Sequence, residues 1–148
     1  MKKAIFNVLL RMVSLISAVL FCFSSLKKTN SEKIRALSNK HVGKRCFIIG
    51  NGPSLDSADL DKIHAAGDLS FAANKIANIF DRTKWRPTYY CVFDEGMPKD
   101  IVELMSQTTA DKKFFRKSSY YWTRKVKGDC VFLHTKGGME YLDNPVFS

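Results

Sequence analysis

Apolar residues in this chain gather in short runs separated by polar segments. Residues 45–50 read Arg-Cys-Phe-Ile-Ile-Gly, a β-branched and aromatic run with no polar alternation. Such a run is typical of a strand that is covered on both of its faces. Comparable runs at residues 69–73, 88–93, 113–116 and 130–133 predict four further strands.

Segments with helical spacing lie between these runs, and the alternation of strand and helix predicts a parallel sheet. We therefore expect an α/β fold, a Rossmann-like, mainly parallel sheet with flanking helices. A chain of 148 residues has room for one ordinary core. We assign residues 45–148 to a partial Rossmann-like nucleotide-binding domain, 29–44 to a connector and 1–28 to a basic, apolar N-terminal helix. The residues with helical spacing are Leu60, Ile63, Ile76, Ile79, Phe80, Ile101, Leu104 and Met105.

The N-terminal helix has two unlike sides and is flanked by lysines. This pattern predicts an amphipathic helix at a membrane surface, with the lysines on anionic lipid. A spanning helix, a cleaved signal peptide, and a helix that packs its apolar side on the domain are the alternatives. On a helical wheel, Ile5, Leu9, Met12, Ile16, Val19 and Phe23 share the apolar side, while Asn7, Arg11, Ser14, Ala18 and Ser25 share the other.

The charge of the chain is concentrated in this arm. Residues 1–45 contain ten Lys and Arg against Glu32 alone, whereas residues 46–148 contain fourteen against thirteen Asp and Glu. A nearly neutral domain has no general attraction for phosphate backbones, so we expect no nucleic-acid partner. We expect the protein in the cytoplasm, at the inner face of the cell membrane.

Cysteine usage points to no metal site. The chain has four cysteines without a C-x-x-C pair or a histidine at ligand spacing, which argues against zinc. Cys46, Cys91 and Cys130 lie in apolar runs, where a reduced thiol behaves as a small buried hydrophobe.

The first strand is followed by a glycine-rich turn of Gly50, Asn51, Gly52, Pro53 and Ser54. Two glycines allow positive φ and let backbone N–H groups converge on a ligand. Pro53 suits the first turn of a helix, and the candidate caps are Ser54, Asp56 and Ser57. Strand, turn and helix N-terminus together predict an anion site, although the sequence is neither G-x-G-x-x-G nor a Walker A motif, and a simple tight turn is the alternative.

Two further polar residues follow the next strands. Asn74 stands where an NAD-binding domain would have an acidic residue, and its amide suits a base or ribose edge. Asp94 is suited to a metal or a sugar hydroxyl, or to capping the next helix. Residues 118–125 interleave aromatic and basic side chains, which would stack a base or pack as a half-buried loop. We expect nucleotide binding at the turn and Asn74, and a catalytic role for Asp94.

The sequence at residues 46–55, 71–76 and 85–90, together with Asp94, resembles the bacterial domain of the 6-hydroxymethylpterin diphosphokinase MptE-like family. That family includes motility accessory factors and proteins of polysaccharide loci. The Gly-Asn-Gly-Pro-Ser turn and the downstream Asn are also similar to CMP-sialic acid dependent sialyltransferases. The resemblance covers about residues 44–95.

This resemblance implies a pocket for a nucleotide or nucleotide-sugar donor. The first hypothesis is a glycosyltransferase-like protein of lipopolysaccharide or capsule synthesis, with a glycan acceptor that is lipid-linked. The second is transfer of diphosphate from ATP to a hydroxymethylpterin, which needs Mg²⁺ and carboxylates such as Asp94 and Glu95. The third is a non-catalytic nucleotide-binding fragment. Because family members run well beyond this length, we expect a truncated member.

Overall fold

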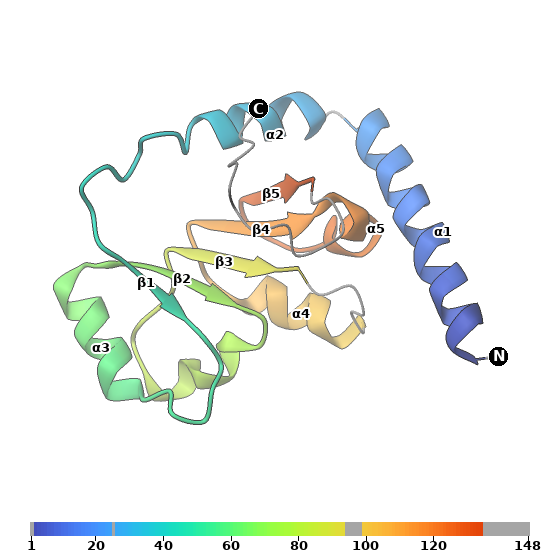
Figure 1. Ribbon diagram of the computed structural model, residues 1–148. Coiled ribbons are helices and arrows are strands. Elements are labelled where there is room, and N and C mark those ends of the chain that lie inside the picture. The colour runs from blue at the N-terminus through green and yellow to red at the C-terminus, as the bar shows by residue number, and fades with distance from the viewer. Residues whose placement is uncertain (1, 25, 94–98, 135–148) are drawn as a thin grey trace.

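The computed structural model describes residues 2–24, 26–93 and 99–134 (Figure 1). Its centre is one five-stranded sheet in which neighbouring strands are parallel throughout and follow one another in chain order. The α/β, Rossmann-like fold expected from the sequence is confirmed. The strands are β1 (Cys46–Ile49), β2 (Leu69–Ala73), β3 (Tyr89–Val92), β4 (Lys112–Arg116) and β5 (Cys130–Leu133).

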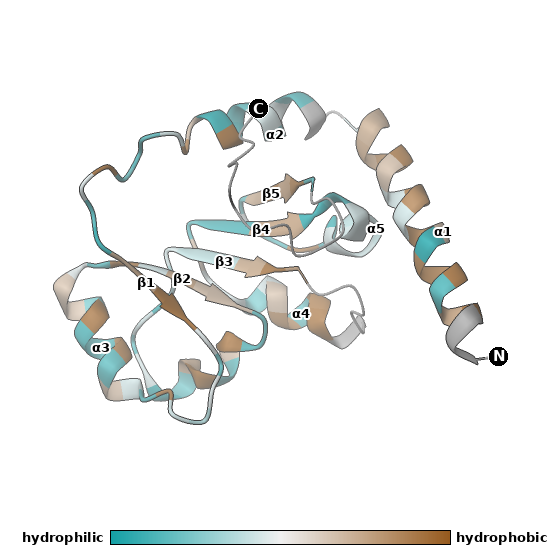
Figure 2. Ribbon diagram, viewed as in Figure 1, coloured by the Kyte–Doolittle hydropathy of each residue, from teal (hydrophilic) through white to brown (hydrophobic). Residues whose placement is uncertain are grey.

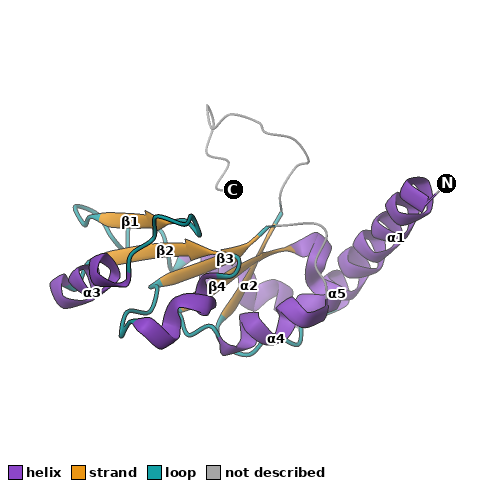
Figure 3. Cartoon of the chain, turned by 90° about the horizontal axis from the view of Figure 1, so that it is seen from below, coloured by secondary structure: helices purple, strands orange, loops and turns teal. Residues whose placement is uncertain are grey.

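The helices between the strands cover one face of the sheet, as Figure 3 shows for α3, α4 and α5. Because the strand order never reverses, each connection carries the chain over the same face, and Leu60, Ile76 and Met105 join one buried core. The segment with helical spacing after β2 is a 3₁₀ helix. The helices are α1 (Lys2–Phe23), α2 (Leu26–Arg35), α3 (Ser57–Ala66), η1 (Ile76–Arg82), α4 (Lys99–Gln107), η2 (Lys117–Ser119) and α5 (Tyr120–Thr123).

The other face of the sheet is covered over only part of its width. Ile34 and Leu37 pack there against a smaller cluster centred on Phe114. They do not extend over β1, where Ile48 is 88% exposed and Cys46 is also exposed. The expectation that this first strand is covered on both faces, with Cys46 buried, is therefore wrong. Among the residues that the structure describes, the helices that follow β1 take the opposite face, and only the segment before β1 covers this one.

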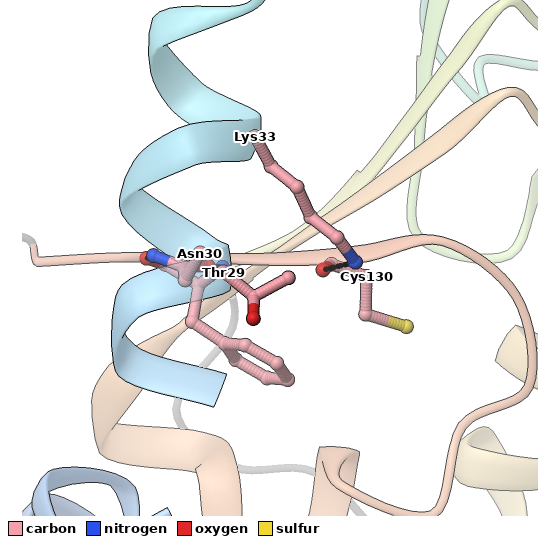
Figure 4. A pocket seen from close by; sticks show the side chains of 5 residues that line it. Thr29, Asn30, Lys33 and Cys130 are labelled. Atoms are coloured by element: carbon pink, nitrogen blue, oxygen red, sulfur yellow. Dashed lines mark hydrogen bonds between the residues drawn. The ribbon is translucent and has the colours of Figure 1, made fainter. Parts of the chain in front are cut away.

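Helix α2 closes the outer edge of β5 (Figure 4). Asn30 is 5% exposed, and its Nδ2 donates to the Phe132 carbonyl at 2.9 Å while its Oδ1 accepts from the Phe132 N–H at 2.6 Å. The Lys33 ammonium donates to the Cys130 carbonyl at 3.2 Å. These bonds satisfy backbone groups that an edge strand otherwise leaves open. Residues 29–44, expected as a connector, thus include side chains that pack on the domain.

Replacing Asn30 with alanine should lower the free energy of unfolding by about 2–3 kcal/mol, because the Phe132 N–H and carbonyl then lose their partners in a buried place. Urea unfolding followed by circular dichroism measures this. Thr29→Ala is the matched control, since Thr29 is the exposed neighbour on the same helix. Equal stability of the two variants would show that the edge contact contributes little.

Helix α1 touches the domain through a narrow stripe. Ser17 and Phe21 are buried: the Ser17 hydroxyl accepts from the Tyr121 N–H at 3.0 Å, and the Phe21 ring meets Tyr120 edge-on at 5.3 Å. The side chains of the apolar side defined by the helical wheel are exposed instead, and Figure 2 marks the hydrophobic residues of α1 in brown. The alternative in which the apolar side packs on the domain is wrong. The exposed residues of that side are Ile5, Leu9, Met12, Ile16, Val19 and Phe23.

Candidate functional site

The carboxyl ends of β1 and β2 lie side by side at one end of the sheet (Figure 1). The two strands are parallel, with Ile49 opposite Ala72, so the turn after β1 and the turn after β2 are neighbours. A side chain joins them, since Asn51 Nδ2 donates to the Ala73 carbonyl at 2.9 Å. The structure therefore brings the predicted residues 50–54 close to the segment that ends in Asn74, as expected for a ligand site in a parallel sheet.

The glycine turn is open. An added Cβ at Gly50 would meet nothing within 4 Å, and one at Gly52 would meet only the Ser54 hydroxyl at 3.8 Å. The Leu55 N–H donates to the Gly52 carbonyl at 3.1 Å, which closes the turn over Pro53 and Ser54. Neither glycine has positive φ. That part of the prediction is wrong, and what the glycines provide is open space beside an exposed backbone.

Free donors remain in this turn. Within the residues that the structure describes, the backbone N–H groups of Gly52 and Ser54 have no hydrogen-bond acceptor. Both residues are exposed, so an anion or a carbonyl oxygen can reach these groups. Paired main-chain N–H groups of this kind are the usual donors to phosphate oxygens.

Helix α3 begins later than the sequence pattern predicts. Asp56 is the N-cap, and its carboxylate accepts from the Ala58 N–H at 3.0 Å, so of the three candidate caps it is the one used. Pro53 precedes the first helical residue by four positions. The positive end of the helix already faces the carboxylates of Asp56 and Asp59. A ligand phosphate would be bound by the turn, and the helix dipole adds little to it.

A groove of about 230 Å³ runs from this turn along α3. This is smaller than the roughly 300–1,000 Å³ of most small-molecule sites. β1 is the outermost strand on this side of the described sheet, so the groove opens at the sheet edge. Asn74 does not line it. The lining residues are Ile49, Gly50, Gly52, Ser54, Leu55, Asp56, Asp59, Leu60 and Ile63.

Asn74 is held in an unusual backbone conformation beside this groove. Its φ is 55°, in the left-handed region that Asn tolerates better than most residues. Its N–H donates to the Cys91 carbonyl at 3.1 Å, and its carbonyl accepts from the Tyr90 hydroxyl at 2.6 Å. The side chain is left exposed. Two residues of β3 thus fix the backbone of Asn74, while its side-chain amide remains available to a ligand.

Tyr90 is a positioning residue that the sequence pattern did not reveal. It lies in the middle of the β3 apolar run and is fully buried, and this burial raises the pKa of its phenol to about 12. The phenol therefore keeps its proton at neutral pH and acts as the donor to Asn74.

Two other predicted features have different outcomes. Asp94, like Glu95, lies outside the described residues. In the described part, no three His, Cys, Asp or Glu side chains come together as a metal site would require. Most of residues 118–125 lie in η2 and α5, which pack against α1 with Tyr120 and Thr123 buried. The stretch is thus packed on the protein, as one alternative expected, but as two short helices instead of a loop.

Comparisons of the chain with protein-family models, with curated proteins and with solved structures found no match. The assignment of a function therefore depends on the geometry of this edge and on the chemistry of its residues.

Proposed function

We propose that the protein is a nucleotide-sugar-dependent, glycosyltransferase-like protein of bacterial surface glycan synthesis, active on a lipopolysaccharide or capsule precursor. One observation carries the proposal: the open glycine turn and the Asn74 turn are adjacent at the carboxyl edge of a parallel sheet, joined by the Asn51 side chain. In this reading, the N–H groups of Gly52 and Ser54 bind a donor phosphate, and the Asn74 amide binds the ribose or base. Asp94 is assigned to the reacting sugar.

The charge of the groove favours a sugar over a triphosphate. Asp56 and Asp59 line it, and among the described residues Asp59 forms a salt bridge, with the Lys62 ammonium at 2.8 Å, whereas Asp56 forms none. Carboxylates accept hydrogen bonds from sugar hydroxyls and repel additional phosphate groups. A donor with its phosphate at the turn and its sugar along α3 fits this distribution better than ATP.

Thermal-shift and calorimetric titrations with CMP, UDP, GDP and ATP, with and without Mg²⁺, test the assignment. Stabilisation by a pyrimidine nucleotide or GDP without metal supports the glycosyltransferase-like proposal. A response to ATP only with Mg²⁺ supports diphosphate transfer, in which Asp94 and Glu95 would hold the metal. If no nucleotide shifts the melting temperature, the proposal is rejected.

Replacing Asn74 with glycine should weaken nucleotide binding about tenfold without lowering the melting temperature, since glycine keeps the left-handed backbone and removes only the amide. Calorimetry gives the affinity. The matched control is Asn39→Gly, because Asn39 also has positive φ, 58°, but lies in the turn after α2. Unchanged affinity of the Asn74 variant would remove this residue from the site.

A further inference from the structure

Helix α1 presents an apolar surface for which the described residues offer no partner. Its stretch Ile5–Phe23 is long and apolar enough to cross a membrane. None of residues 5–16 is buried, and the helix extends beyond the sheet in both views (Figures 1 and 3). A soluble protein rarely leaves so many large apolar side chains together in water.

The docking of α1 on the domain limits how it can enter a bilayer. Ser17 and Phe21 are buried against η2 and α5, so from residue 17 onward one side of the helix is held against the domain, whereas residues 5–16 have no buried side. Twelve such residues, 5–16, extend about 18 Å as a helix, whereas a spanning helix must cross about 30 Å of hydrocarbon. A docked α1 is therefore too short to span. Its apolar side faces one direction, which suits a helix lying in one leaflet.

The domain beside α1 carries the complementary chemistry. Residues 117–127, which form η2, α5 and the segment after them, contain four Lys and Arg and no Asp or Glu. Arg124 and Lys125 are exposed at the end of α5, and the Arg124 guanidinium lies 5.2 Å from the centre of the Tyr121 ring. Trp122 is half-buried next to them. Aromatic and basic side chains at the base of an apolar helix are typical of the headgroup region of a membrane.

We propose that α1 and the η2–α5 segment form a single membrane-binding surface, in which α1 lies in one leaflet and the basic residues of α5 contact anionic headgroups. η2 follows the carboxyl end of β4, the edge of the sheet where the glycine turn and Asn74 also lie. The candidate site is therefore on the membrane side of the domain. At this position the site could reach an acceptor that is anchored in the membrane by a lipid. The inference of a lipid-linked acceptor rests on the proposed function, and the membrane-binding surface does not.

Flotation of the full chain with phosphatidylcholine vesicles, with and without phosphatidylglycerol, tests the surface. We expect the chain to float, and to float more with the anionic lipid. Met12→Glu with Ile16→Glu should abolish flotation, whereas the same two charges at Asn7 and Ala18, on the other side of α1, should reduce it far less. Equal losses for the two pairs, or no flotation of the unaltered chain, would overturn the proposal.

The basic contribution has its own variant pair. Arg124→Glu with Lys125→Glu should weaken partitioning onto anionic vesicles roughly tenfold or more, since each basic residue near such a surface contributes favourably. Arg82→Glu with Lys84→Glu makes the same change of charge at exposed positions at the end of η1 and just after it, and should have little effect. If both pairs weaken partitioning onto anionic vesicles equally, the effect comes from the net charge of the chain, and the proposed role of α5 is overturned.

Labelling with a membrane-impermeant amine reagent separates a one-leaflet helix from a spanning one. With the chain bound outside sealed vesicles, Lys2 and Lys3 should react as fully as in the lipid-free chain. Their protection would mean that α1 crosses the bilayer, which contradicts the proposal. A lipid-free dimer that disperses in the Met12→Glu, Ile16→Glu variant would instead assign the apolar side to a second copy. Nucleotide titrations are independent of these results, so each proposal fails by itself.

Discussion

Replacing Lys113 with methionine should lower the free energy of unfolding by about 3 kcal/mol, one of the two largest losses that we expect from a single substitution. Lys113 is on β4 and is only 3% exposed. Its ammonium donates to the carbonyls of Met105 at 2.7 Å, Ser106 at 3.2 Å and Lys127 at 2.8 Å. The first two are in the last turn of α4, whose carbonyls have no partner inside the helix.

Two opposing effects decide the size of this loss. Desolvation opposes the charge, and burial lowers the pKa of Lys113 below its ordinary value. A buried charge replaced by an apolar side chain can be nearly neutral in stability when its partners are replaced as well. Here the carbonyls stay and become unsatisfied, at a cost of about 1–3 kcal/mol for a buried polar group. The loss of hydrogen bonds outweighs the relief of desolvation, because three carbonyl groups accept from the one Lys113 ammonium.

Urea unfolding of Lys113→Met beside Lys127→Met measures the effect. Lys127 is exposed, and only its carbonyl takes part in the contact, so its variant should unfold like the unaltered chain. A Lys113 variant of undiminished stability would mean that water or a shifted helix end satisfies the carbonyls.

Truncating Trp85 to alanine should cost about 3–5 kcal/mol, the range for removing a large aromatic side chain from a core. Trp85 is 1% exposed and its indole N–H donates to the Ser70 hydroxyl at 3.1 Å. Trp85→Phe keeps most of the apolar contact but loses the hydrogen bond to Ser70. The lost bond should lower the free energy of unfolding by about 1 kcal/mol, in addition to the effect of the smaller ring on packing. Thermal and urea unfolding by circular dichroism give both values. Trp122→Ala is the control, and its loss should be much smaller because that ring is half-buried. Similar losses at the two positions would contradict this account.

The sheet was largely predictable from the sequence. Its strands are short apolar runs, and the helical spacing between them requires crossovers, which make neighbouring strands parallel. The exposure of Ile48 was not predictable, because an apolar run shows that a strand prefers burial and says nothing about which segment covers it. Coverage depends on the strand order across the whole sheet, which no local pattern contains.

The candidate site was predictable in position and less so in mechanism. The glycine turn and Asn74 were found from their places after strands, but the conformation of Gly50 and Gly52 and the late start of α3 were not. The contacts that fix the surroundings involve distant partners. Tyr90 supports Asn74 from the next strand, and the Asn30 contact joins residues 102 positions apart. Such pairs leave no periodic signal in a single sequence.

The two outer strands of the described sheet differ in whether a further strand could pair with them. Asn30 and Lys33 occupy main-chain groups of β5, so an incoming strand would have to displace a helix there. β1 has no such occupant among the described residues, and its own Ile48 is exposed. A further strand could therefore pair with the outer side of β1, next to Gly50, without displacing a described element. It would reverse the strand order at that point and give the groove a second wall, and such a reversal is where α/β sheets bind their ligands.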